Sequence, residues 1–85
     1  MAADVTLYGN ETCPWCGAAR MLLTQRGIAY TEKSVSADPA VLEEMIVRSG
    51  SRSVPQIFVG DTHVGGYDEL SSLDASGELK ELLGK

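Results

Sequence analysis

The sequence of 85 residues lacks the features that membrane insertion, nucleic-acid binding and zinc binding require. No run of apolar residues is long enough to cross a bilayer, so we expect no membrane partner. Lys and Arg number 7 against 12 Asp and Glu, and the net charge of −5 argues against nucleic acid as a partner. Two Cys and one His are too few soft ligands for a closed zinc site, which needs four, so we expect no metal.

Signals for export and for a second domain are also missing. No basic segment followed by an apolar stretch stands near the N-terminus, and two cysteines are too few for the disulfide framework of a secreted domain. We therefore expect a cytoplasmic protein. The length allows one domain, residues 1–85, and 44% hydrophobic with 22% charged residues is typical of a soluble globular fold.

What the sequence does contain is one pair of closely spaced cysteines, Cys13 and Cys16. The residues Val5–Tyr8 favour a strand and Pro14–Arg26 favour a helix, so Cys13 falls at the junction between them. The proline that begins this helix suits the first helical position, which leaves Thr12 or Cys13 as the helix cap.

This placement predicts different acidities for the two thiols. The free N–H groups at the start of a helix carry partial positive charge, which favours the thiolate of Cys13. Cys16 lies one helical turn later on the same face, close enough to form a disulfide with Cys13 or to donate its S–H to the Cys13 thiolate. We predict that Cys13 is exposed with a lowered pKa and that Cys16 is more buried and less acidic.

A structural disulfide and a metal site are the alternative uses of these cysteines. The disulfide would close a loop of only four residues and would therefore stabilise the fold poorly. A metal site would need ligands beyond His63, the only other soft ligand in the chain. A spacing of two residues beside a strand–helix junction is typical of a redox-active pair, so we favour thiol–disulfide chemistry over both alternatives.

The remaining patterns predict an α/β fold with the element order β-α-β-α-β-β-α. The predicted strands are Val5–Tyr8, Ala29–Ser34, Gln56–Val59 and Thr62–Val64, and the predicted helices are Pro14–Arg26, one that Asp38 caps and Gly50 closes, and one from Tyr67 to Leu83 with a break at Asp74–Gly77. A helical crossover makes the first two strands parallel, and the Gly60-Asp61 turn makes the last two a hairpin. We therefore expect a mixed four-stranded sheet with helices on both faces and a ligand near the end of the first strand.

Five further side chains are given structural rather than chemical roles. We expect Met21 to fill the core beneath the first helix. Glu44 belongs with Glu43 to the solvated face of the second helix. His63 is interpreted as a surface residue and not a base, because nothing nearby in the sequence orients it. Asp68 is the candidate cap of the last helix.

Three separated motifs, Cys13-Pro14-Trp15-Cys16, Ser53-Val54-Pro55 and Gly65-Gly66-Tyr67-Asp68, together make the chain resemble the dithiol class of the glutaredoxin family. The resemblance covers nearly the whole chain and is strongest to small bacterial glutaredoxins. It implies a thioredoxin-like fold. It also implies a cis peptide bond before Pro55, which would place the Val54 backbone beside the two cysteines.

The resemblance further implies a groove for glutathione. The cysteine moiety of glutathione would pair with the main chain of Val54 in the manner of an added strand, and its γ-glutamyl carboxylate would meet the start of the last helix. The side chain of Trp15 would form a flat apolar wall beside the reactive sulfur. The implied glutathione-binding residues are Trp15, Arg52, Ser53, Val54, Pro55, Gly66, Tyr67 and Asp68.

Two residues depart from the pattern of the family. Asn10 stands three residues before the first cysteine, where the family commonly has Lys or Arg. A charge that would bind the glycine carboxylate of glutathione and help lower the thiol pKa is therefore missing, and Arg52 is the candidate replacement. Ser53 takes the place of a common Thr, which is a mild change.

The activity that the resemblance implies is glutathione-dependent thiol–disulfide oxidoreduction. Cys13 would attack protein–glutathione mixed disulfides, Cys16 would resolve the intermediates of protein disulfides, and glutathione would be the reducing cosubstrate. The implied partners are glutathione and glutathionylated or disulfide-containing proteins, and we expect a monomer. Two alternatives are a thioredoxin-type reductase and a carrier of a glutathione-ligated iron–sulfur cluster. Pro14 argues against the carrier, because a smaller residue is usual there in such family members.

Overall fold

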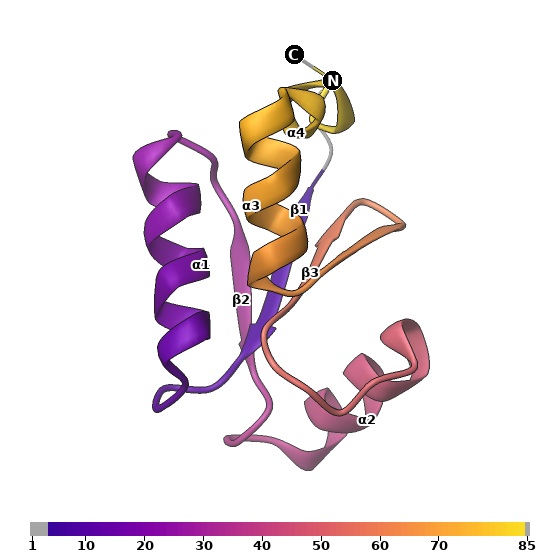
Figure 1. Ribbon diagram of the computed structural model, residues 1–85. Helices are drawn as coiled ribbons and strands as arrows, with labels where there is room; N and C mark the ends of the chain where they lie inside the picture. Colours follow the sequence, from indigo (N-terminus) through magenta and orange to yellow (C-terminus); the bar gives the residue numbers. More distant parts are fainter. Residues whose placement is uncertain (1–3, 85) are drawn as a thin grey trace.

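The computed structural model describes residues 4–84, which form a four-stranded sheet with helices packed against it (Figure 1). The elements are β1 (Val5–Gly9), α1 (Pro14–Gln25), β2 (Thr31–Ser34), α2 (Pro39–Ser49), β3 (Gln56–Val59), β4 (Thr62–Gly65), α3 (Tyr67–Ser76) and α4 (Glu78–Leu82). Their order agrees with the prediction, and the break before the C-terminus separates α3 from α4 at Gly77. None of these helices has the length and apolar character that a membrane crossing demands.

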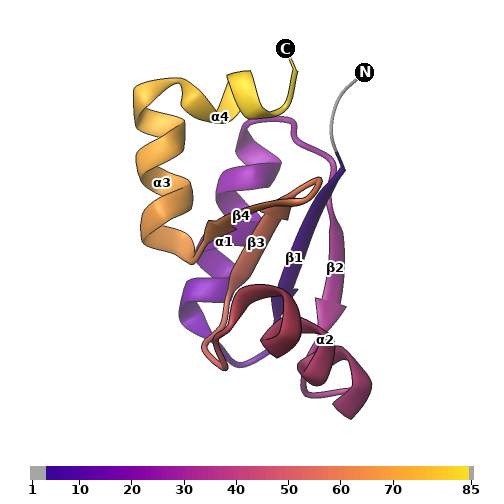
Figure 2. The same ribbon diagram turned by 90° about the vertical axis from the view of Figure 1, so that its right-hand side faces the viewer.

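The sheet has the strand order β2-β1-β3-β4. Strand β2 runs parallel to β1, whereas β3 runs antiparallel to both β1 and β4. Figure 2 shows α2 on the near side of the sheet and α1 on its far side. The predicted mixed sheet with helices on both faces is therefore confirmed. Because β1 is an inner strand, the loop that leaves its carboxyl end starts from the middle of the sheet.

Alternation along the strands separates the core into two apolar clusters, one on each face of the sheet. The larger cluster lies between the sheet and the helices α1, α3 and α4, and its buried members are Val5, Leu7, Ala19, Leu23, Ile28, Ile57, Val59, Leu70, Leu79 and Leu83. The smaller cluster lies under α2 and contains Tyr8, Met45 and Phe58. Leu7 and Tyr8 belong to different clusters, so β1 is packed from both sides and gives the following loop a firm origin.

The buried face of α1 differs from the predicted one. Cys16, Ala19 and Leu23 are buried, whereas Met21 is 62% exposed, so the assignment of Met21 to the core is wrong. Successive residues of an α-helix are rotated by about 100° around the helix axis. Met21 therefore lies on the opposite side of the helix from Ala19 and Leu23. The prediction chose the face with the larger side chains, but the small side chains of Cys16 and Ala19 let this helix approach the sheet closely.

The termini of α2 and α3 are capped in different ways. Asp38 accepts a hydrogen bond from the Ala40 N–H at 2.9 Å, which confirms its predicted role. Asp68 is not the cap of α3, because the helix begins directly after Gly66 and Asp68 is its second residue. Glu69 instead folds back and accepts the Gly66 N–H at 3.1 Å, so the terminal donor is satisfied from within the first turn.

Glu44 is not simply part of a solvated face. Its half-buried carboxylate accepts hydrogen bonds from the Tyr8 hydroxyl and from Lys33 Nζ, the latter at 2.9 Å, and these two partners hold its pKa below the ordinary range. Arg48 donates to the same Tyr8 hydroxyl at 2.8 Å. This polar cluster ties α2 to β1 on the face of the sheet opposite α1.

Candidate active site

Cys13 is the N-cap residue of α1, with extended backbone angles of φ −82° and ψ 118°, and Pro14 follows at the first helical position. Of the two residues that the sequence left open as the cap, the structure selects Cys13. Its carbonyl oxygen accepts the first helical hydrogen bond from the Gly17 N–H at 3.2 Å. The Cys13 side chain makes no capping hydrogen bond of its own, so its sulfur stays at the open end of the helix.

The loop that carries Cys13 is shaped by Asn10. The Asn10 Oδ1 accepts hydrogen bonds from the Thr12 N–H at 3.1 Å and from the Thr12 hydroxyl at 3.2 Å. An asparagine side chain that binds the backbone two residues later is a common way to build a tight turn. Sequence reasoning treated this position only as a missing positive charge, whereas the structure gives it a role in placing the cysteine.

The two thiols are free and differ in exposure. The Cys13 sulfur is partly exposed, and partial burial raises its pKa. This effect is outweighed by hydrogen bonds from the Cys16 side chain and from the Cys16 and Trp15 N–H groups, together with the Arg20 charge. The pKa of Cys13 is therefore lowered from its ordinary value of 9.0, in agreement with the prediction.

Cys16 is 0% exposed, and burial is the main reason that its pKa rises to about 11. The Asn10 N–H opposes this rise by donating to the sulfur, while the neighbouring Cys13 thiol reinforces it. At neutral pH the pair therefore consists of an ionisable Cys13 and a protonated Cys16 that can donate its proton toward the thiolate.

Gly9 at the end of β1 makes room for Cys16, and sequence reasoning did not find this role. A Cβ atom at position 9 would lie 2.9 Å from Cys16 Sγ and 3.1 Å from Leu7 Cδ2. The first distance is shorter than real Cβ contacts, and the second is a tight contact, so glycine at this position lets Cys16 pack closely against β1. In the sequence, Gly9 is indistinguishable from a glycine that merely ends a strand.

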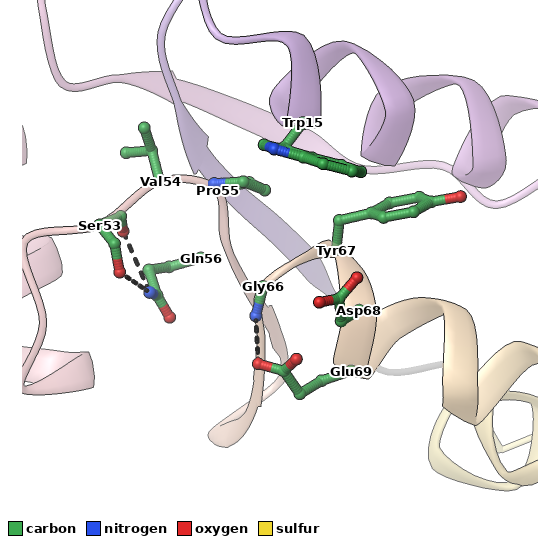
Figure 3. Close-up of a pocket in the computed structure, with 9 residues that line it drawn as sticks. All are labelled: Trp15, Ser53, Val54, Pro55, Gln56, Gly66, Tyr67, Asp68 and Glu69. Atoms are coloured by element: carbon green, nitrogen blue, oxygen red, sulfur yellow. Dashed lines mark hydrogen bonds between the residues drawn. The ribbon is translucent and has the colours of Figure 1, made fainter.

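A groove opens between the start of α1, the loop before β3 and the start of α3 (Figure 3). The Val54–Pro55 peptide bond is cis, and Cys13 Sγ lies 3.8 Å from the Val54 carbonyl oxygen. The residues that line the groove are Trp15, Ser53, Val54, Pro55, Gln56, Gly66, Tyr67, Asp68 and Glu69. Seven of the eight expected glutathione-binding residues are thus brought together, whereas Arg52 is exposed and does not line the groove.

One wall of the groove is aromatic. The Trp15 indole stacks on the Tyr67 ring, with ring centroids 5.7 Å apart and an interplanar angle of 30° (Figure 3). Trp15 is 58% exposed, which leaves a broad apolar surface near the sulfur for a ligand or a protein substrate. The opposite wall is the main chain around Val54, whose polar groups favour an extended peptide.

Gln56, which lines the groove, is held by a contact with His63 that the sequence did not suggest. Gln56 Nε2 donates to the Ser53 carbonyl oxygen at 3.0 Å, and Gln56 Oε1 accepts from His63 Nε2 at 2.7 Å. The His63 ring also stacks on Phe58, with centroids 4.8 Å apart. His63 is exposed as predicted, but the expectation that nothing orients it is wrong, because the hairpin brings β4 beside the start of β3.

The residues that could hold a metal ion are spread out. Within residues 4–84, no group of three or more His, Cys, Asp or Glu side chains gathers at one place. The arrangement at the end of α1 is instead suited to thiol chemistry: an accessible, acidified sulfur, a protonated neighbour one turn away and a groove beside them.

Comparison with known proteins gives a consistent result. The family model described as Glutaredoxin matches residues 5–64 of this chain. Glutaredoxin 3 of Escherichia coli K12 is 47% identical over 81 residues, which cover 95% of this chain and 98% of the relative. The solution structure of glutaredoxin from Brucella melitensis superimposes with a TM-score of 0.84 at 43% identity, covering 99% of this chain and 94% of that one.

A more distant match supports the fold alone. The crystal structure of a buckwheat glutaredoxin–glutathione complex superimposes with a TM-score of 0.86 at 24% identity, covering 96% of this chain and 77% of that one. Together with the strand order and the paired thiols, these matches confirm the thioredoxin-like fold. The chain therefore belongs to the glutaredoxin family and is a thiol–disulfide oxidoreductase.

Proposed function

We propose that this protein uses glutathione as its reductant and acts on protein–glutathione mixed disulfides and on protein disulfides, with Cys13 as nucleophile and Cys16 as resolving thiol. The observation that carries this proposal is the position of the acidified Cys13 sulfur, 3.8 Å from the carbonyl oxygen of Val54, a residue that lines the groove. A sulfur at this place meets a peptide thiol that lies extended along the Val54 main chain.

In the first proposed reaction, the Cys13 thiolate attacks the glutathione sulfur of a protein–glutathione disulfide. The disulfide of the substrate breaks, and the protein thiol leaves as a thiolate that takes a proton from solvent. Cys13 is then joined to glutathione. A second glutathione thiolate attacks the bound glutathione sulfur, which releases oxidised glutathione and returns Cys13 to its thiolate form.

In the second proposed reaction, the Cys13 thiolate attacks one sulfur of a protein disulfide and forms a mixed disulfide with the substrate. Cys16 loses its proton and attacks Cys13 Sγ, which releases the reduced substrate and leaves a Cys13–Cys16 disulfide. Two glutathione molecules then reduce this disulfide. Because the pKa of Cys16 is about 11, its proton must leave as the attack proceeds.

The groove supplies binding and orientation for both reactions. We propose that Val54 pairs with the cysteine moiety of glutathione, that Trp15 and Pro55 flank its sulfur, and that Tyr67 and Asp68 N–H groups at the start of α3 receive the γ-glutamyl carboxylate. These residues all line one groove. The Gly66 N–H already binds Glu69, so a ligand carboxylate has to share or displace that contact.

The remaining assignments are also proposals. Ser53 lies in the groove and is proposed to contact the glycine end of glutathione, whereas Arg52 is exposed beside it and is proposed as a weaker, outer contact. We further propose that the protein acts as a monomer in the cytoplasm. Its protein substrates are glutathionylated or disulfide-containing proteins.

A coupled assay with a glutathionylated peptide as substrate tests the proposed function. We expect turnover with glutathione and glutathione reductase, and little turnover with thioredoxin reductase in place of both. Equal turnover with thioredoxin reductase would favour a thioredoxin-type reductase. Anaerobic purification that yields a brown protein requiring glutathione for its colour would favour the iron–sulfur carrier.

A further inference from the structure

Arg20 lies on the same side of α1 as the two cysteines, one turn beyond Cys16. Its Nη2 donates a hydrogen bond to the Asn10 carbonyl oxygen at 2.9 Å. Asn10 is the first residue of the loop that carries Cys13, and its N–H donates toward the Cys16 sulfur. The guanidinium group is therefore attached to the first residue of the loop that carries Cys13.

The edge of the Arg20 guanidinium formed by Nε and Nη2 faces Glu32 of β2. Arg20 Nε lies 2.8 Å from both carboxylate oxygens of Glu32, and Arg20 Nη2 lies 2.7 Å from Oε2. The Arg20 side chain is 25% exposed and the Glu32 side chain 31% exposed. Arginine presents several donors in a fixed plane, so one guanidinium can bind a carboxylate and a carbonyl oxygen at the same time.

The charged and titratable groups around the sulfurs are few among residues 4–84. Cys16 and Arg20, both on α1, act on Cys13, and the loop before β3 presents the Val54 carbonyl oxygen to it. Glu32 and Tyr30, at and before β2, act on Arg20. The Arg20 charge favours the thiolate of either cysteine, and the Glu32 charge next to it weakens that effect.

We propose that Arg20 is a positioning residue for the reaction, which holds the Asn10 end of the active-site loop and places a positive charge near the Cys13 sulfur, while Glu32 sets how strongly that sulfur feels the charge. The proposal rests on the role of Cys13 as nucleophile. If Arg20 only joined α1 to β2, its replacement would lower the stability slightly and would leave the pH dependence of Cys13 unchanged.

The test measures the pH dependence of iodoacetamide alkylation in the Cys16→Ser background, where one titrating thiol remains. Arg20→Met should move the midpoint of the Cys13 alkylation rate to higher pH and should slow alkylation at pH 6 about twofold. Glu32→Gln should move the midpoint to lower pH. Arg20→Lys keeps the charge and should restore the parent midpoint, and the double variant Arg20→Met with Glu32→Gln should lie close to the parent.

Arg26 and Asp74 provide a matched control. They form a second arginine–carboxylate pair at the far end of α1, with Arg26 Nε 2.8 Å from Asp74 Oδ1. Arg26→Met changes the net charge as Arg20→Met does and should leave the midpoint where it is. The proposal is overturned if both variants shift it equally, if Arg20→Met shifts nothing, or if Glu32→Gln shifts it upward.

Failure of this inference is separable from failure of the proposed function. An unchanged midpoint in Arg20→Met with normal glutathione turnover would remove the role of Arg20 and leave Cys13 as the nucleophile. Loss of glutathione turnover in the unmodified protein would remove the proposed function, whereas alkylation would still report on Arg20. Thermal unfolding of each variant shows whether a shift reflects the site or a loss of fold.

Discussion

Cys13 and Cys16 lie one helical turn apart, yet their surroundings differ in almost every respect. Cys13 stands at the open N-terminus of α1, where the Cys16 side chain, backbone N–H groups and a nearby arginine favour its anion. Cys16 is fully buried against Gly9 of β1, where low polarity favours the neutral thiol. The difference shows that position at a helix terminus and depth in the fold set the acidity of each thiol, since the residue type is the same.

Replacing each cysteine by serine in turn should have the largest effect on activity and should separate the roles of the two thiols. We expect Cys13→Ser to abolish turnover of all disulfide substrates, because no other accessible thiol remains to attack. Cys16→Ser should retain reduction of glutathionylated peptides but lose glutathione-driven reduction of protein disulfides. Steady-state assays with both substrate types provide the measurement, and equal losses in the two variants would contradict the separate roles.

The second prediction concerns Gly9, the residue of β1 against which Cys16 packs. Gly9→Ala places a methyl group 2.9 Å from Cys16 Sγ, so we expect a loss of about 1 to 3 kcal/mol in the free energy of unfolding. Urea denaturation measures it. Gly17→Ala is the control, because the nearest neighbour of a Cβ atom there is Arg20 Nη1 at 4.0 Å. This substitution should stabilise α1 by roughly 0.5 to 1 kcal/mol, since alanine favours a helix more than glycine does. A harmless Gly9→Ala would show that Cys16 is less tightly packed.

The third and smallest effect concerns the support of the groove. His63→Leu removes the donor to Gln56 Oε1, so Gln56 should hold the Ser53 carbonyl oxygen less firmly. The loss of one such hydrogen bond predicts a rise of about fivefold in KM for glutathionylated peptide, with kcat nearly unchanged. His63→Gln retains a side-chain donor and should recover part of the loss. A fall in kcat without a change in KM would place His63 in the chemistry instead.

The sequence predicted most of the architecture because the local signals were strong and agreed with one another. The Cys13–Pro14 pair marks both a helix start and a reactive position, and Asp38 and Gly50 mark the ends of α2. The Gly60-Asp61 turn identified the hairpin. Each of these signals is contained in a few neighbouring residues, so no knowledge of tertiary packing was needed.

The features that sequence reasoning missed depend on contacts between distant segments. Met21 was placed in the core because its size suits burial, but the close packing of α1 turned the smaller Ala19 inward. His63 reaches Gln56 only once the hairpin has formed. Arg20 meets the Asn10 carbonyl oxygen only when the loop and α1 have closed on each other. None of these pairings leaves a pattern in the linear sequence.

The pH dependence of alkylation in the reduced wild-type protein, mapped separately for each cysteine by mass spectrometry, tests the central claim most directly. Because only the thiolate reacts, the rate at each sulfur rises with pH through its own pKa. We predict a midpoint below 9.0 for Cys13 and no reaction of Cys16 until the pH approaches its pKa of about 11. A common midpoint for both sulfurs, or earlier reaction of Cys16, would contradict the account.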